Sequence, residues 1–488
     1  AMANPLDVEA VDDLRFQSGC HIEAVVAPPS EVARGILSAY GGELPELLRR
    51  LERIARPAVS GEARVLEREA RAAPIVRIVD HLLAKAVRGR ASDIHIESHG
   101  KGSRVRFRVD GLLGTTTELP PGTHRAAISR VKIMAGLDIS ERRRPQDGGF
   151  TFREGALELT VRVSTIPTRA GEKAVLRILD TGEAPPDLTE LGLAGRDLER
   201  LRSLLGRHQG VILAAGPTGS GKTTTLSAIV RLLSAQELNV ITLEDPIEYR
   251  FPGVAQMEID RRAGMGFPEG LRAILRQDPD VIMVGEIRDR ETAEIAMSAA
   301  VTGHLVLSTI HTVDAPGAVV RLLEMGVPKF LVAGGLSGVV AQRLVRRICS
   351  RCMGRGKECP RCTDGLRGRC GVFEVLAIDD EIRTAVAAGT SISVLRSLAR
   401  TNGMGSMGDD ALRHVANGTT TPHEAGRILS LATGPEVPCG GCGRPVPPGA
   451  VGCPGCGLAR RLLCGCGETL ERRWRYCPRC LRPARAAA

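Results

Sequence analysis

Eight residues at 216–223, GPTGSGKT, have the types and spacing of a loop that binds phosphate. The loop follows the apolar run VILAA and precedes the helix-like run TTTLSAIVRLL, which is the context that the pattern requires. Its glycines let backbone N–H groups turn toward phosphate oxygens, and the helix N-terminus adds positive dipole. Lys222 is placed to reach the terminal phosphates, and Thr223 to ligate Mg²⁺. The predicted phosphate-binding residues are Gly216, Pro217, Thr218, Gly219, Ser220, Gly221, Lys222, Thr223 and Thr224.

Acidic side chains follow two further apolar runs. VIMVGE (281–286) has Gly285 where an aspartate commonly closes such a strand, and Glu286 comes one position later. LEDPIEY (243–249) supplies Glu244 and Asp245. Ligands of open α/β sheets bind at the carboxyl ends of the strands, so these acids should share the edge of the phosphate loop. One carboxylate can then hold the Mg²⁺ shell while another positions an attacking water.

Two histidines flank the apolar run LVLSTI (305–310). His304 precedes the run and His311 follows it. His311 should therefore lie at the nucleotide-facing end of the strand, where it is placed to donate a hydrogen bond to a γ-phosphate.

Cysteines are the third chemical signal, because thirteen of the 14 lie between Cys349 and Cys480. Paired cysteines in a chain without secretory features indicate metal before disulfides, and four thiolates suit tetrahedral Zn²⁺. The predicted zinc sets are Cys349, Cys352, Cys359 and Cys362; Cys439, Cys442, Cys453 and Cys456; and Cys464, Cys466, Cys477 and Cys480. Redox-active pairs are the alternative. Cys20 and Cys370 are left single, and Cys370 is expected to be a small buried residue.

The phosphate loop and its acids require a sheet to position them. Short apolar strands at 211–216, 238–244, 281–286 and 304–311 alternate with helices, which predicts an α/β core with a mostly parallel sheet covered on both faces. This core should span 188–432 and include the cysteines at 349–362. TGEAPPD (181–187) and ATGPEVP (432–438) are predicted linkers, and 439–480 reads as a double zinc ribbon that has no means of forming a core without metal.

A smaller α/β domain is predicted at 74–180. A helix from Pro74 should run into a strand with alternating Ile94 and Ile96, followed by the hairpin signal RVRFRVDG (104–111). The helix AAISRVKIMAGL and the strands LELTVRVSTIPT and EKAVLRIL should complete it. Residues 1–62 read as partly helical or linker, with ELPELLRRLERIA (43–55) as a helix, and carry no motif that we can assign.

Composition limits the function classes. The 488 residues allow about three domains, and 43% hydrophobic with 25% charged residues is ordinary for folded proteins. The net charge of +10 invites a nucleic-acid reading, but 59 of the 66 basic residues are arginine and they are spread along the chain. Only 12 aromatics argue against base stacking. The acidic N-terminus is unlike a secretory signal and 295–313 is a poor membrane span, so we expect a cytosolic protein.

Several motifs in order closely resemble the type II secretion and type IV pilus assembly ATPase family. They are ASDIHIE, RFRVDG, ERRRPQDGGF, GPTGSGKTTTL, ITLEDPIEY, LRQDPDVIMVGEIRDRETA, TGHLVLSTIHT and GRCGVFEVL, within about 74–430. The resemblance identifies 216–223 as the phosphate loop, 242–249 as the aspartate box, 278–286 as an atypical Walker B motif and 303–312 as a histidine box. Glu286 after Gly285 is thus a family trait, and both His304 and His311 gain support as nucleotide-contacting residues.

The resemblance implies a hexameric motor with a RecA-like P-loop ATPase core and a preceding small α/β, PAS-like domain. Its cofactors would be ATP, Mg²⁺ and Zn²⁺, and its partner an inner-membrane platform protein of a secretion or pilus system. Arginines of the small domain would reach the phosphates; Arg162 and Arg177 fit best by motif position, and Arg143 and Arg144 less well. The protein would be cytoplasmic and peripheral to the inner membrane, without a transmembrane segment of its own.

Two alternatives stay open at this point. One is a nucleic-acid-associated P-loop ATPase that uses its zinc ribbons for binding, although 439–480 holds only a modest basic excess. The other is a regulatory adaptor with a vestigial motor, which the intact Lys222, Thr223, Glu244 and Glu286 oppose. Retraction is disfavoured, because family members that retract pili generally lack the cysteine insert.

Overall fold

The computed structural model describes most of residues 73–430 and short pieces beyond them. The described residues are 25, 73–99, 102–119, 122–155, 157–179, 184–260, 263–356, 359, 362–430, 437–439, 441, 445–446, 462–463 and 469–470. They divide into two compact units, 1–180 and 181–488. The helix expected at 43–55 lies outside the described residues.

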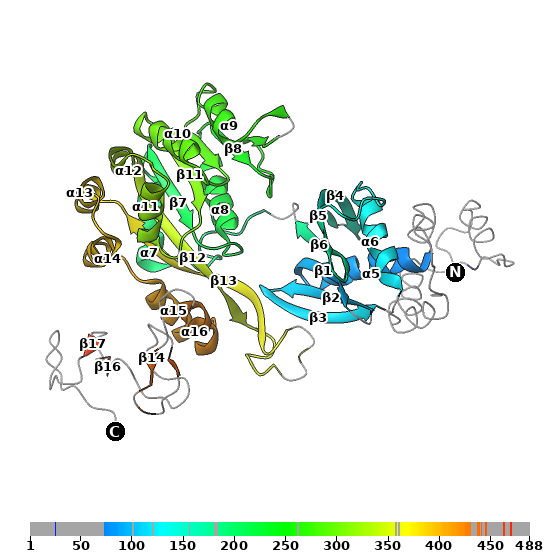
Figure 1. Cartoon of the computed structure of the whole chain (residues 1–488). Helices are drawn as coiled ribbons and strands as arrows, with labels where there is room; N and C mark the ends of the chain where they lie inside the picture. The colour runs from blue at the N-terminus through cyan, green and yellow to red at the C-terminus, as the bar shows by residue number, and fades with distance from the viewer. Residues whose placement is uncertain are drawn as a thin grey trace. The chain divides into compact units, whose positions relative to one another are not determined.

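In its described residues the first unit is an antiparallel six-stranded sheet with two helices, and both layers can be followed in Figure 1. Its elements are α5 (Ala73–Arg88), β1 (Ala91–His99), β2 (Gly102–Val109), β3 (Leu112–Leu119), α6 (Thr123–Met134), β4 (Gln146–Glu154), β5 (Leu157–Thr168) and β6 (Gly171–Leu179). The strand order is β3-β2-β1-β6-β5-β4. Asp110 and Gly111 both have positive φ (49° and 85°), which is the backbone of the tight turn that joins β2 to β3.

Strand alternation gives this sheet two unlike faces. Ile94 and Ile96 of β1 point to the buried core, which α5 and α6 complete. The other face carries a row of cross-strand neighbours: Arg108 on β2, Asp93 on β1, Arg177 on β6 and Arg162 on β5. The strands predicted around RVRFRV, LELTVRVSTIPT and EKAVLRIL are therefore present, while β4 was not predicted. Its mixed sequence QDGGFTFRE hides the alternation.

The second unit is built on a seven-stranded sheet (Figure 1). Its strands are β7 (Gly210–Ala215), β8 (Val240–Glu244), β9 (Ala255–Glu258), β10 (Val281–Val284), β11 (Leu305–Ile310), β12 (Leu336–Ile348) and β13 (Leu366–Ala377). The order is β13-β12-β7-β11-β10-β8-β9, and every pair is parallel except β12 with β13. The four predicted core strands are thus confirmed, and a mostly parallel sheet results. The strands β9, β12 and β13 were not predicted.

Helices cover both faces of this sheet. One hydrophobic core contains α7 (Gly195–Leu205) and α8 (Lys222–Ser234). The core on the opposite face contains α9 (Phe267–Ile274), α10 (Arg290–Val301), α11 (Ala315–Glu324), α12 (Lys329–Gly335), α13 (Asp380–Ala388), α14 (Ile392–Thr401), α15 (Met407–Ala416) and α16 (Pro422–Ser430). Because both faces are buried, β7 and β10 are apolar throughout rather than alternating, and β11 is buried along its whole length although it includes Ser308 and Thr309.

Beyond residue 430 the structure describes two short hairpins. β14 (Val437–Pro438) pairs with β15 (Pro445–Val446), and β16 (Leu462–Leu463) pairs with β17 (Thr469–Leu470). None of the described helices combines the length and the apolarity needed to cross a bilayer.

Candidate active site and metal centre

The predicted phosphate loop is the turn between β7 and α8. Gly216, Gly219 and Gly221 all have positive φ (153°, 77° and 87°), a conformation that disfavours residues with a Cβ atom. Lys222 opens α8 and is only 8% exposed. Its Nζ donates to the carbonyl oxygens of Gly216 and Pro217, each at 3.0 Å. Burial lowers the pKa of Lys222 to about 8, against the opposing attraction of Glu286.

Glu286 lies at the same edge of the sheet, where β10 ends. The residues on either side of it are tied to Thr309 of β11: Thr309 Oγ1 donates to the Gly285 carbonyl (2.8 Å), and the Ile287 N–H donates to the Thr309 carbonyl (2.9 Å). These two bonds fix the position of Glu286 relative to the end of β11, and therefore relative to His311. The His311 Nε2 to Glu286 Oε2 distance is 3.8 Å.

His311 and Lys222 lie within electrostatic reach of each other. Burial lowers the pKa of His311, and the charge of Lys222 lowers it further, while Glu286 opposes both. The imidazole is therefore biased toward its neutral form, in which one ring nitrogen donates and the other accepts. Lys222, Glu286 and His311, which come from three different elements, are thus the predicted site residues that the structure brings together.

Glu244 ends β8 at this edge, but further from the phosphate loop. In the strand order β7-β11-β10-β8 it lies three strands from β7, about 14 Å between strand axes. Its carboxylate is 3% exposed and accepts hydrogen bonds from Thr242 Oγ1 (2.7 Å) and Gln256 Nε2 (3.1 Å). Burial raises its pKa, and these bonds work against that rise. The neighbouring Asp245 is exposed.

His304 lies at the opposite edge. It precedes β11, and its backbone carbonyl accepts from Gly210 at the start of β7, whereas the phosphate loop follows the end of β7. Its Nδ1 is 2.9 Å from the Ala299 carbonyl oxygen. Strand β11 therefore separates His304 from His311 by about 20 Å, and the structure does not bring His304 to this site.

Arg162 and Arg177 belong to the first unit. Both are exposed on the charged face of its sheet. Arg177 Nε is 3.0 Å from Asp93 Oδ1, and Asp93 is itself 5% exposed and also faces Arg108 at 3.7 Å. Arg162 has no ion-pair partner among the residues that the structure describes. Arg143 and Arg144 are exposed as well.

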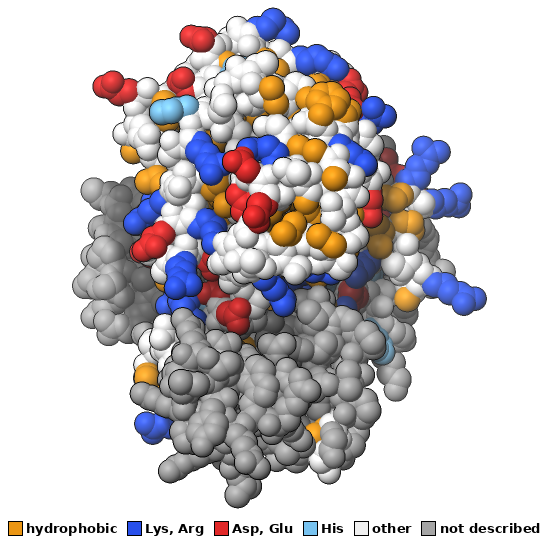
Figure 2. Space-filling model, turned by 90° about the vertical axis from the view of Figure 1, so that its left-hand side faces the viewer, with side chains coloured by type: hydrophobic (Ala, Val, Ile, Leu, Met, Phe, Trp, Pro, Cys, Tyr) orange, Lys and Arg blue, Asp and Glu red, His pale blue; other side chains and the backbone are white. Residues whose placement is uncertain are grey.

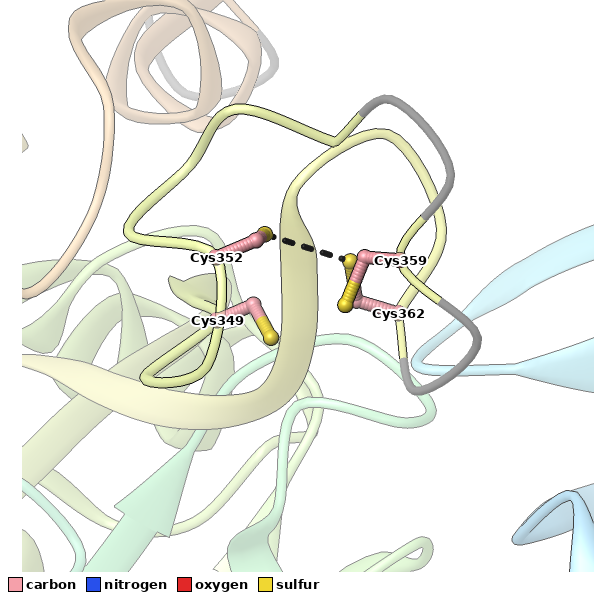
Figure 3. Close-up of side chains that lie close together, drawn as sticks. All are labelled: Cys349, Cys352, Cys359 and Cys362. Carbon is pink, nitrogen blue, oxygen red and sulfur yellow. Dashed lines mark hydrogen bonds between the residues drawn. The ribbon is translucent and has the colours of Figure 1, made fainter.

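Four cysteines meet in the loop that joins β12 to β13 (Figure 3). The sulfur atoms of Cys349, Cys352, Cys359 and Cys362 all lie within 4.8 Å of one another, and those of Cys352 and Cys362 are 3.6 Å apart. Tetrahedral zinc with Zn–S bonds of about 2.3 Å places its sulfurs about 3.8 Å apart. The cluster therefore fits one four-coordinate metal ion.

The tail cysteines are described only in part. Cys439 is buried and follows β14, and the Gly441 N–H donates to its sulfur at 3.4 Å. Cys464 and Cys466 fall between β16 and β17 in the sequence. Cys442, Cys453, Cys456, Cys464, Cys466, Cys477 and Cys480 lie outside the described residues. Cys370 is buried on β13 as expected, and burial raises its thiol pKa to about 11.

Arg288 was not predicted from the sequence to be a site residue. Its Nε lies 2.6 Å from Glu286 Oε2, so this exposed guanidinium is a direct ion-pair partner of the proposed catalytic carboxylate. Its position two residues after Glu286 is the signal that could have identified it.

Elsewhere the positive charge is dispersed: Figure 2 shows acidic side chains beside basic ones over the described part of one face. That pattern does not favour the nucleic-acid alternative.

Known proteins match most of the chain. The family model described as "Type II/IV secretion system protein" matches residues 68–427. A second model, "MshEN domain", matches residues 1–46, where we could assign no motif. Among solved structures, the pilus retraction motor PilT with bound ADP is 27% identical, with a TM-score of 0.52 and coverage of 72% of this chain and 96% of that one. The ATPase DotB of Legionella pneumophila has the same fold (TM-score 0.58, 24% identity, 73% and 96% coverage).

Curated relatives are more similar. The type II secretion system protein HxcR of Pseudomonas aeruginosa is 48% identical over 363 residues, which cover 73% of this chain and 77% of that protein. The type IV pilus assembly ATPase PilB of Myxococcus xanthus is 40% identical over 457 residues, which cover 87% of this chain and 81% of that protein. The family model covers residues 68–427, and relatives from type II secretion and from type IV pilus assembly match most of the chain. The chain, with its P-loop and with Glu286 at the same sheet edge, belongs to the family of type II secretion and type IV pilus assembly ATPases.

Proposed function

We propose that this ATPase binds Mg²⁺ and ATP at residues 216–224 and hydrolyses ATP at the sheet edge where Lys222, Glu286 and His311 meet. The observation that carries the proposal is the buried Lys222 at the turn into α8, which interacts electrostatically with the Glu286 carboxylate after β10 and the His311 imidazole after β11. A lysine held in this way suits the charge of a terminal phosphate.

Each residue has a proposed role. Thr223 ligates the metal ion. Glu286 orients the attacking water, because its charge acts on Lys222 and its backbone neighbours are held by Thr309. His311 donates to the γ-phosphate. Glu244 and Asp245 act on the metal shell through bridging water, because β8 lies three strands from β7 and Glu244 is held by Thr242 and Gln256.

The small domain supplies cations in this proposal. Both side chains are exposed: Asp93 holds Arg177 in place, and Arg162 is not engaged by any described carboxylate. Each guanidinium group can therefore present N–H donors to phosphate oxygens. The core is RecA-like and the small domain PAS-like. Six chains form the motor, so that arginines supplied across an interface link hydrolysis to movement.

The motor drives type II secretion or type IV pilus assembly at the inner membrane, through a platform protein. Identities of 40–48% to type II secretion proteins and to a type IV pilus assembly ATPase support these two functions without distinguishing between them. Zinc occupies the cluster at 349–362, where the thiolates would supply its four bonds, and two further zinc ions order the ribbons at 439–480.

The test is ATP turnover of the full chain with K222A and E286Q. Both should lower turnover by about 100-fold or more while gel filtration still detects the hexamer. The control is E324Q, because Glu324 is an exposed residue of α11 whose carboxylate pairs, among the described residues, only with Arg321. Normal turnover in both K222A and E286Q would exclude this site.

A further inference from the structure

Strand β12 carries two consecutive polar residues, Gln342 and Arg343, in the otherwise apolar run VVAQRLV. Both are buried, with 1% and 7% exposure. Neighbouring side chains of a strand point to opposite faces of the sheet. Accordingly, Val340 belongs to the core that contains α8, while Val339 and Ala341 belong to the core that contains α11. Gln342 therefore faces the phosphate loop and Arg343 faces the other layer.

Gln342 is hydrogen-bonded to the phosphate loop and lies close to two of its glycines. Its Nε2 donates to the Ser220 carbonyl at 2.6 Å. A Cβ atom on Gly216 would come within 2.7 Å of the Gln342 carbonyl oxygen, and one on Gly221 within 2.9 Å of Nε2. The two glycines are therefore required by the closeness of Gln342 as well as by their own positive φ.

The amide of Gln342 is only half satisfied. Its donor is used, but its Oε1 is buried with no hydrogen-bond partner among the described residues, and the same is true of Ser220 Oγ. An unpaired buried acceptor costs free energy, and an apolar side chain would avoid that cost. A glutamine is present here despite this cost, which points to a role for its side-chain N–H, namely the hydrogen bond to the Ser220 carbonyl of the phosphate loop.

Arg343 holds the segment that follows His311. Its Nη2 donates to the Val313 carbonyl at 3.1 Å, and its Nη1 to the Gln342 carbonyl at 3.3 Å. Asp314 and Glu374 attract the buried guanidinium. Asp314 also caps α11 by accepting from the Gly317 N–H, and Glu374 accepts from the Ala315 N–H. The start of α11 and the residues after His311 are thus attached to β12 through Arg343.

We propose that Gln342 and Arg343 are positioning residues for ATP hydrolysis. Gln342 sets the shape of the phosphate loop, and Arg343 sets the place of the segment that carries His311. Because the two residues are consecutive in one strand, both loops share a single support, which sets the spacing between them. This inference rests on the proposed function, since it concerns the same phosphate site.

The two residues should separate in steady-state kinetics. Q342M removes the donor to Ser220 at similar side-chain size, so the KM for ATP should rise about tenfold while kcat stays within about twofold. Q342N keeps the amide but shortens it by one methylene, so it should raise KM in the same way. A wild-type KM in a folded Q342M or Q342N protein would overturn the role of Gln342.

R343K keeps the charge but loses the two-pronged contact with Val313 and Gln342. Its kcat should fall about tenfold with KM nearly unchanged, because His311 acts after ATP is bound. The matched control is R346K, which alters an arginine of the same strand whose guanidinium pairs with Glu424 of α16. R346K should lower the melting temperature but keep both constants. If R343K leaves kcat unchanged, or if R346K reproduces its loss, Arg343 supports only the strand.

K222A in the same series separates this inference from the proposed function. Loss of turnover in K222A together with a wild-type KM in Q342M overturns the inference alone. Wild-type turnover in K222A overturns the proposed site and the inference with it.

Discussion

Replacing Lys222 with methionine should stabilise the nucleotide-free protein, although it removes a residue that the proposed mechanism of hydrolysis requires. The side chains are similar in length, but methionine carries no charge into the buried turn between β7 and α8. The pKa of Lys222 falls from 10.5 to about 8 because of its burial, which corresponds to about 3 kcal/mol of destabilisation in the charged form. Loss of the bonds to the Gly216 and Pro217 carbonyls offsets about 1–2 kcal/mol of this gain.

The net gain of about 1–2 kcal/mol should raise the melting temperature by about 2–8 °C. The sign of the pH dependence follows from the lowered pKa. Between pH 8 and 10.5 the unfolded chain binds more protons than the folded one, so the folded wild type recovers stability as the pH rises through this range. The advantage of K222M should therefore be full below pH 8 and shrink toward pH 10.

Scanning calorimetry at pH 7 and pH 10 in nucleotide-free buffer measures both effects. K329M, which changes an exposed lysine of the same unit, serves as the control and should leave the melting temperature nearly unchanged. Added Mg·ATP should then stabilise the wild type but not K222M. A K222M protein that melts at or below the wild-type temperature at pH 7 would refute the argument that burial of this charge is costly.

Three further predictions concern other parts of the chain. Elemental analysis of the purified protein should find three zinc ions per chain, and the double variant C349S/C352S should lose one of them; an unchanged zinc content would exclude the cluster as a metal site. D93N should free Arg177 and Arg108 and lower ATP turnover about fivefold, whereas D110N in the β2–β3 turn should not; equal turnover in both variants would argue against a role for the held arginine. Burial alone would raise the pKa of Glu424, but hydrogen bonds from Arg346 and Arg427 hold it at about 2. Because this folded pKa lies below the unfolded one, Glu424 adds about 3 kcal/mol above pH 4.5 that is lost as the pH falls toward 2. Urea unfolding at pH 7 and pH 3 should show this loss in the wild type and a smaller one in E424Q.

Short sequence patterns predicted the elements whose structure depends on neighbouring residues alone, namely the central strands, the phosphate loop and the cysteine cluster. The runs VILAA and VIMV are continuous apolar segments, as strands buried on both faces must be, and both proved to be central strands. The phosphate loop needs glycines and a lysine at fixed spacing, so its sequence predicts its shape. In the same way, the short spacing of Cys349, Cys352, Cys359 and Cys362 predicted that their sulfur atoms would lie close together.

Features that depend on pairing between distant segments were not predictable in the same way. β12 and β13 are joined through the cysteine loop, and the polar pair Gln342 and Arg343 interrupts the apolar pattern of β12. Both residues are buried because loops more than 20 residues away approach them from two sides, at Ser220 and Val313. Asp93 likewise reads as an ordinary polar strand residue until register places it between Arg108 and Arg177.

The place of the four-cysteine loop has a consequence for how this protein can change over evolutionary time. The loop sits where the two longest strands of the second unit turn back, and Ile348 and Leu366 pair directly at its base. Its length and metal content can therefore vary without altering the ladder between β12 and β13 or the strands beside it. Insertions and deletions at this position should therefore change the size of the loop at the tip of the β12–β13 hairpin and leave the fold of the ATPase core unchanged.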